Sequence, residues 1–149
     1  MEKIHNKSIA ERMNKMSYQN FNVSVYCPVS NINKITDFED FDRKFKLLYG
    51  NVKIGRAYLE CYRGMEWCDK EQLLKVQSFF ESKGIATSGG ITTCDESNNE
   101  CFISLCYSTE KGQEILRKAV ALNAEVFDEF IFDDFYFLNC RCEACIKQK

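Results

Sequence analysis

The chain has 149 residues, a formal net charge of −2 and 28% charged residues, which is the composition of one ordinary globular domain. Nucleic-acid binding requires a basic face, and the scattered cations near both ends form none, so we expect no nucleic-acid partner. No apolar run is long enough to cross a bilayer, and residues 1–18 lack the apolar centre of a signal peptide. We therefore expect a protein with no membrane partner that is made and kept in the cytoplasm.

The first 20 residues are expected to be a separate, poorly defined segment. Ile4, Ile9, Met13 and Met16 fit the apolar stripe of a helix, but the stripe is thin and a frayed terminus fits equally well. Residues 21–149 contain no linker or low-complexity stretch. They are expected to form one domain.

Four segments of this domain have the apolar, β-forming character of buried strands. They are residues 21–26, 52–59, 85–91 and 127–132. Three helical patterns lie between them. A capping box of Thr36 and Glu39 begins the first, Asp69 begins the second and Gly84 ends it, and the third covers about 110–124. Strands that alternate with helices at intervals of about 30 residues are typical of parallel βα units, so we predict an α/β fold with a parallel sheet.

In parallel α/β folds, ligands bind at the carboxyl ends of the strands. Four short stretches lie there: Tyr26 and Cys27; Glu60, Tyr62 and Arg63; Thr92, Thr93, Asp95 and Glu96; and Asp133, Asp134 and Tyr136. The polar residues of these stretches are the candidate site residues.

Asp133 and Asp134 are the strongest candidates because they close an apolar run. Two adjacent carboxylates repel each other, and the flanking Phe132 and Phe135 would raise the pKa of the less solvated one. A raised pKa is what an acid catalyst needs. A strand-to-loop turn, where aspartate caps backbone amides, explains the pair equally well. Alternation along the strand points the two side chains in opposite directions, so at most one faces the site directly.

Other polar and aromatic residues could bind a sugar. Glu60 and Arg63 could bind a polyol or a second carboxylate, or they could form an ordinary exposed ion pair. Tyr62, Trp67 and Tyr136 could supply flat platforms on which sugar rings stack, although single aromatic residues more often serve packing.

Nine cysteines in a chain without an export signal are expected to be reduced. Cys27, Cys61, Cys94 and Cys106 lie in or beside apolar runs, where a thiol packs as a small hydrophobic group.

The segment NCRCEAC brings together Cys140, Cys142 and Cys145, whose spacing allows one zinc ion or an iron–sulfur cluster. A fourth ligand could come from Cys68, Cys94 or Cys101, and structural thiols or a local disulfide are the alternatives to a metal.

Several segments resemble a known family. VYCPVSNINKITDFEDF, AYLECYRG, KGIATSGGIT and, most specifically, DDFYFLNCRCEACIK resemble the N-terminal half of uncharacterised glycoside-hydrolase-like (β/α)8-barrel proteins of gut bacteria. The resemblance implies carbohydrate as the substrate class and a partial TIM barrel, about the first four strands, over 21–149. It also implies that Asp133 and Asp134 lie at the end of barrel strand four as active-site carboxylates.

This resemblance leads to two functional hypotheses. In the first, a truncated or half-barrel glycoside hydrolase uses Asp134 as acid with Asp133 in support, Glu60 and Arg63 bind sugar hydroxyls, and Tyr62, Trp67 and Tyr136 contact sugar rings. In the second, the chain is a non-catalytic half-barrel module stabilised by metal or self-association. A complete barrel takes about 250 residues, so we expect self-association or a missing C-terminal half as partner. No cofactor is expected beyond a structural zinc.

Overall fold

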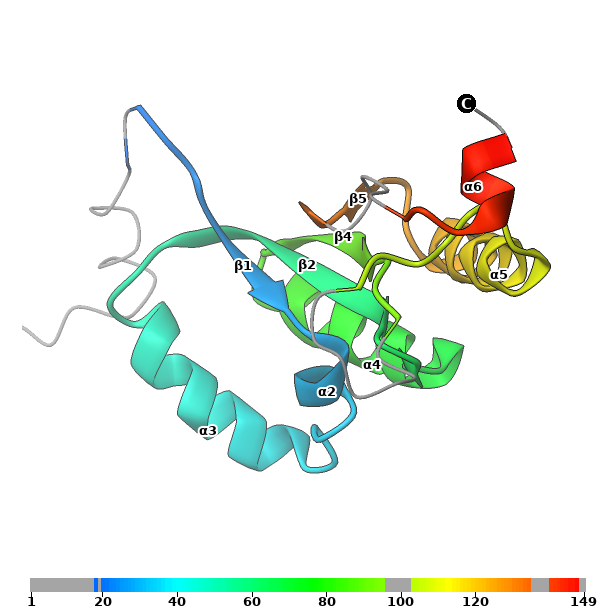
Figure 1. Ribbon diagram of the computed structural model, residues 1–149. Coiled ribbons are helices and arrows are strands. Elements are labelled where there is room, and N and C mark those ends of the chain that lie inside the picture. The colour runs from blue at the N-terminus through cyan, green and yellow to red at the C-terminus, as the bar shows by residue number, and fades with distance from the viewer. Residues whose placement is uncertain (1–17, 19, 96–102, 135–139, 148–149) are drawn as a thin grey trace, which may run out of the picture.

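The computed structural model describes residues 18, 20–95, 103–134 and 140–147 (Figure 1). The sequence expectations for residues 1–17, Cys101 and Tyr136 fall outside these ranges. Within them, none of the helices is both long and apolar enough to span a membrane.

A parallel sheet forms the centre of the molecule, as predicted. Its strands are β1 (Val23–Cys27), β2 (Ile54–Arg63), β3 (Glu66–Trp67), β4 (Ala86–Thr92) and β5 (Phe130–Phe132). Strands β1, β2, β4 and β5 pair in that order, all parallel, while β3 folds back as an antiparallel hairpin on β2.

The three long helices gather on one side of this sheet, and two short helices follow β1 and β5 in the chain (Figure 1). They are α2 (Val29–Ile32), α3 (Phe38–Tyr49), α4 (Lys70–Glu81), α5 (Glu110–Val126) and α6 (Glu143–Lys147). The main core lies between the sheet and helices α3, α4 and α5, where β2 contributes the fully buried Ala57, Leu59 and Cys61. Successive side chains of a strand point to opposite faces of the sheet. Arg56, Tyr58 and Glu60 alternate with the buried apolar residues of β2 and therefore point to the face opposite the three long helices.

Local signals explain where the helices begin and end. Helix α3 is capped by Asp37, which accepts hydrogen bonds from the Glu39 and Asp40 amides; the predicted capping box at Thr36 was one residue too early. Asp69 caps α4 as predicted. Gly84, with φ of 72°, takes the left-handed conformation that follows this helix and lets the next amide reach back to the helix end.

Strands β2 and β5 differ most in length from the sequence expectation. Strand β2 continues four residues past the predicted end, through Arg63, because Gly64 and Met65, both at positive φ, turn the chain into the β3 hairpin. Strand β5 is shorter than expected and begins at Phe130. Phe127 is instead the C-cap of α5 and is buried against the core. Because β2 extends to Arg63, Glu60 lies inside this strand and not in the loop after it. Strand β5 has only three residues.

Candidate functional site

Glu60 is the centre of a polar cluster on the sheet face away from the helices. Its side chain is 0% exposed. Its Oε1 accepts a hydrogen bond from the Tyr26 hydroxyl at 2.8 Å, and its Oε2 accepts one from the Val29 backbone amide at 2.7 Å. Arg63 Nε lies 3.0 Å and 3.1 Å from the two carboxylate oxygens. Both oxygens are thus occupied by protein donors.

Arg63 joins Glu60 to Asp133 across the sheet. One guanidinium nitrogen, Nη2, lies 3.0 Å from Glu60 Oε1 and 3.0 Å from Asp133 Oδ2, so these two oxygens are no more than 6.0 Å apart. The Thr92 hydroxyl sits between the same two groups, in contact with Glu60 Oε1 and 3.1 Å from Asp133 Oδ2. Tyr26, Glu60, Arg63, Thr92 and Asp133 are called the carboxyl-end cluster below.

The fold explains why these five residues meet. They lie at or just past the carboxyl ends of four adjacent strands, which share one edge of a parallel sheet. Gly90 of β4 makes room, because a Cβ atom there would lie 2.8 Å from the Tyr26 hydroxyl. The missing side chain lets Tyr26 of β1 lean across the sheet to Glu60.

Burial and the nearby Glu60 carboxylate together shift the pKa values of Arg63 and Tyr26. Burial lowers the pKa of the Arg63 guanidinium, but the hydrogen bond and charge of Glu60 outweigh it and hold that pKa above its ordinary value. Burial raises the pKa of the Tyr26 hydroxyl, and the nearby Glu60 charge raises it further. At neutral pH the cluster therefore contains a cationic arginine and a neutral tyrosine.

The two adjacent aspartates face different surroundings, as expected, although both lie past the end of β5, so strand alternation is not the cause. Asp133 joins the cluster, and its side chain remains 32% exposed. The Asp134 backbone amide donates to Asp133 Oδ1 at 2.8 Å, while residue Asp134 itself is exposed. One aspartate is thus fixed by Arg63 and Thr92, and the other faces solvent beside it.

Two of the predicted aromatic platforms, Tyr62 and Trp67, lie outside the carboxyl-end cluster. Tyr62 is fully buried, and its hydroxyl donates to the Cys94 carbonyl at 3.1 Å. Its ring packs against Trp67 with centroids 4.6 Å apart. In this conformation Tyr62 has no face open to a sugar.

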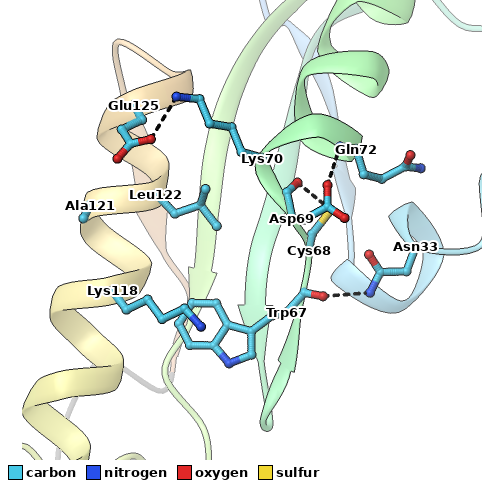
Figure 2. A pocket seen from close by; sticks show the side chains of 10 residues that line it. All are labelled: Asn33, Trp67, Cys68, Asp69, Lys70, Gln72, Lys118, Ala121, Leu122 and Glu125. Carbon is cyan, nitrogen blue, oxygen red and sulfur yellow. Dashed lines mark hydrogen bonds and ion pairs between the residues drawn. The ribbon is translucent and has the colours of Figure 1, made fainter.

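Trp67 lines a cavity of about 730 Å³ between α4 and α5, on the helical side of the sheet (Figure 2). Lys118 Nζ lies 4.1 Å from the centroid of its ring, and the Trp67 carbonyl accepts a hydrogen bond from Asn33. One face of the indole is therefore covered by a lysine, away from the carboxyl-end cluster.

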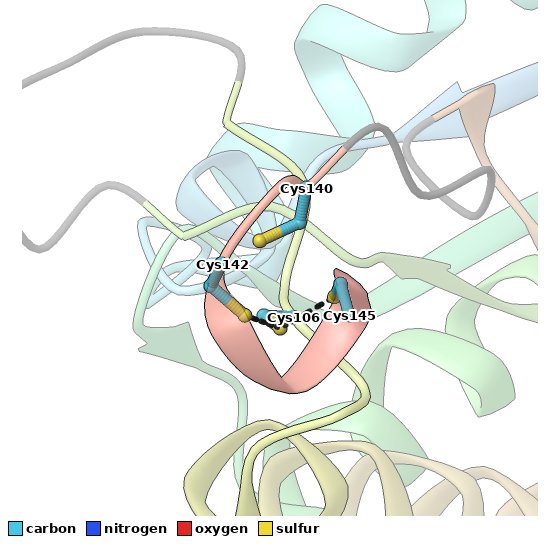
Figure 3. A group of neighbouring side chains, drawn as sticks. All are labelled: Cys106, Cys140, Cys142 and Cys145. Atoms are coloured by element: carbon cyan, nitrogen blue, oxygen red, sulfur yellow. Dashed lines mark hydrogen bonds between the residues drawn. The ribbon is translucent and has the colours of Figure 1, made fainter. Parts of the chain in front are cut away.

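The cysteine segment forms a second constellation. The sulfur atoms of Cys106, Cys140, Cys142 and Cys145 all lie within 4.8 Å of one another and point toward a common centre (Figure 3). The fourth member is Cys106 rather than Cys68 or Cys94, both of which are buried away from this group. The Cys145 amide and the neighbouring thiols lower the pKa of Cys142 to about 7.

Sequence reasoning missed part of both groups. The strand-end rule selected the stretches with Tyr26 and Thr92, but no local signal showed that both would bind Glu60. Cys106 was interpreted as an apolar filler because it lies beside Leu105. Its contact with the distant cysteine segment is set by the tertiary fold.

A parallel α/β fold with ionised side chains gathered at its strand ends is an arrangement common among enzymes. The sequence model of a family described as "Probable glycosyl hydrolase, catalytic domain" matches residues 9–149, and the chain belongs to this family. An uncharacterised protein of Saccharolobus solfataricus is 30% identical over an alignment of 135 positions, and the match covers 85% of this chain and 22% of that protein. The chain thus spans about a fifth of that relative's length. No solved structure matched the chain.

Proposed function

We propose that the carboxyl-end cluster is part of a carbohydrate site and that the domain hydrolyses glycosidic bonds when the rest of a (β/α)8 barrel completes it. The observation that carries the proposal is the bridge from Glu60 through Arg63 to Asp133. It joins two strands at the edge where parallel α/β enzymes bind ligands, on the face that the described helices leave uncovered. Membership of a glycosyl hydrolase family supports the choice of substrate class.

The geometry suggests a division of labour. Asp134, whose exposed side chain can reach a substrate beside the cluster, serves as the acid once bound substrate and the rest of the barrel exclude water from it. Asp133 supports it and contacts the substrate. Arg63, whose side chain is 33% exposed, donates hydrogen bonds to sugar hydroxyls. Glu60 has no exposed surface, so it holds Arg63 and Tyr26 in place.

A glycosidase needs two carboxylates across the scissile bond, about 5–5.5 Å apart in retaining enzymes and about 6.5–9.5 Å in inverting ones. Glu60 and Asp133 approach the shorter spacing. Glu60 is nevertheless buried with both oxygens bound, so it cannot reach a substrate. The partner of Asp134 must therefore come from another segment of the complete domain.

This requirement also favours the alternative function, a non-catalytic carbohydrate-binding module. Among the described residues of the cluster, Arg63 forms ion pairs with both Glu60 and Asp133. Binding a polyol needs only such fixed donors and acceptors, whereas hydrolysis needs a second reactive carboxylate.

Substitution of Asp134 separates the two functions. The longest in-frame protein that contains this chain would be assayed with a panel of aryl glycosides. Asp134→Asn should lower turnover by at least about a hundredfold, the usual contribution of an acid–base group. Asp128→Asn, an exposed aspartate before the amino end of β5, should leave turnover unchanged.

Unchanged turnover in a folded Asp134→Asn protein would contradict the catalytic assignment. If no glycoside is cleaved but the protein binds oligosaccharides, and Arg63→Lys weakens that binding, the non-catalytic function is supported. Absence of both hydrolysis and binding across the panel would contradict both proposals.

A further inference from the structure

The four-cysteine group lies outside the carboxyl-end cluster, and no role in carbohydrate chemistry accounts for it. We propose that Cys106, Cys140, Cys142 and Cys145 bind one zinc ion, and that this zinc joins the chain that follows β4 to the chain that follows β5.

The sulfur positions fit a single small ion. A zinc ion bound to four thiolates at about 2.3 Å places neighbouring sulfurs about 3.8 Å apart. Cys106 Sγ lies 3.7 Å from Cys142 Sγ and 3.5 Å from Cys145 Sγ, and no pair in the group exceeds 4.8 Å. In iron–sulfur clusters the four cysteines are divided among two or four irons, so at least some of their sulfur atoms must lie farther apart than around one metal ion. The four cysteines are free thiols and not two disulfides.

Packing fixes Cys106 in this position independently of any metal. Its carbonyl accepts a hydrogen bond from the Thr109 hydroxyl at 2.8 Å, at the start of α5. Gly112 in the first turn of that helix leaves space for the same carbonyl, because a Cβ atom there would lie 1.9 Å from it. These contacts with α5 hold the backbone at Cys106 without any contribution from the other three cysteines.

The loop that carries Cys106 is also tied to the end of β4. The Leu105 amide donates to the Thr93 carbonyl at 2.8 Å, and the Tyr107 hydroxyl donates to the Thr93 side chain at 2.7 Å. Thr93 follows Thr92 of the carboxyl-end cluster. On the other side, Cys140, Cys142 and Cys145 follow β5 and Asp133 in the chain.

A zinc ion at this point therefore joins the two loops that flank the cluster. Helix α6 has only five residues, too few to be stable without tertiary support, and its Cys145 is buried in the group. Metal binding would supply that support, since the free energy of binding at a structural zinc site is also free energy of folding.

The test is metal analysis of the 149-residue chain, purified under reducing conditions without chelator. We expect about one zinc per chain. Cys106→Ser should remove it. Cys68→Ala and Cys94→Ala are matched controls, because both are buried cysteines outside the group, and both should retain the zinc.

Hydrogen exchange of the same samples tests the structural role. Chelation of the zinc should abolish protection of the amides at 140–147. The amides around 103–108 and those of β2 and β4 should stay protected, because Thr93 and α5 hold the Cys106 loop without the metal. Equal loss of protection throughout the sheet, or no loss at all, would overturn the assignment of zinc as a link between the two loops.

Cobalt substitution keeps the proposal testable if Cys106→Ser fails to fold. Cobalt(II) in the wild-type chain should give the intense visible and sulfur-to-metal bands of a tetrahedral four-thiolate site. The proposal is overturned if the reduced chain takes up no zinc, if the isolated metal is iron, or if Cys106→Ser retains full zinc.

Discussion

Glu60 is a buried carboxylate whose oxygens are held by a tyrosine hydroxyl, a backbone amide and an arginine. Removing one partner of a buried ion pair costs about 3–5 kcal/mol, because the other charge is left uncompensated. Arg63 is one-third exposed, and water screens part of that loss. The remaining cost arises because a glutamine keeps only one acceptor oxygen, so either the Tyr26 hydroxyl or the Val29 amide would lose its acceptor.

We predict that Glu60→Gln lowers the free energy of unfolding by about 2–3 kcal/mol, somewhat less than for a fully buried pair. The amide places a donor where a carboxylate oxygen received one. Urea unfolding followed by Trp67 fluorescence measures the change, and the exposed Glu114→Gln should be within about 0.5 kcal/mol of wild type. A Glu60→Gln change as small as that of the control would show that the network adds little stability.

At the scale of elements, β4 depends on two adjacent glycines that serve opposite faces of the sheet. A Cβ atom on Gly89 would lie 1.8 Å from Asn123 Oδ1 and 2.8 Å from Phe127, both of which belong to or end α5. Gly90 makes the equivalent room for Tyr26 on the other face. Strand β4 thus lets a helix approach closely on one side and the polar cluster form on the other.

Gly89→Ala is predicted to destabilise the protein by about 1–3 kcal/mol, the usual cost of overpacking a core. Gly55→Ala in β2 is the matched control, because its nearest neighbour would be the Val23 carbonyl at 3.8 Å, an ordinary contact. Thermal or urea unfolding would compare the two. If both alanine variants have the same stability, the close packing of α5 on β4 has no energetic weight.

The elements that sequence reasoning located correctly are those marked by local signals. Apolar periodicity located β1, β2, β4, part of β5 and the three long helices. Asp69 marked the start of α4, and Gly84 marked the turn that follows its end. The β3 hairpin was missed because the Gly64–Met65 turn interrupts a run that had already been assigned to a loop. Phe127 was placed in a strand because its apolar character alone does not distinguish a strand residue from a helix cap that packs on the core.

For the candidate site too, the sequence predicted what depends on local signals and missed what depends on contacts between distant segments. The rule for strand ends found the stretches that carry Glu60, Arg63 and Asp133. At most one aspartate was expected to face the site, and one does, but the expectation rested on strand alternation and both aspartates lie past the end of β5. Long-range pairing was not predictable: the burial of Glu60 and the approach of Cys106 to Cys142 depend on how distant segments pack. Tyr62 shows the limit most clearly, since its position at a strand end gave no indication that its ring would be buried.

At the scale of the whole molecule, the described sheet is open at both sides. Strand β1 pairs only with β2, and β5 only with β4, so each leaves one row of backbone groups unpaired within the described part of the chain. The face opposite the helices bears Ile131, which is 39% exposed, beside partly buried aromatic rings of β1 and β2. An open edge with an apolar face is a template for another chain, and a barrel removes both by closing.

We therefore predict that the isolated 149-residue chain self-associates. Ile131→Lys should shift it toward monomer, because a charge at an edge strand opposes pairing with a second sheet. Leu47→Lys is the control: Leu47 is 75% exposed on α3, so the same change in charge there should leave association unaltered. Light scattering over a concentration series measures the mass. A monodisperse species of 17.4 kDa at every concentration, unfolding in one cooperative step, would show that the open sheet is stable without a partner. That result would remove the main physical reason to expect a second half that completes the barrel.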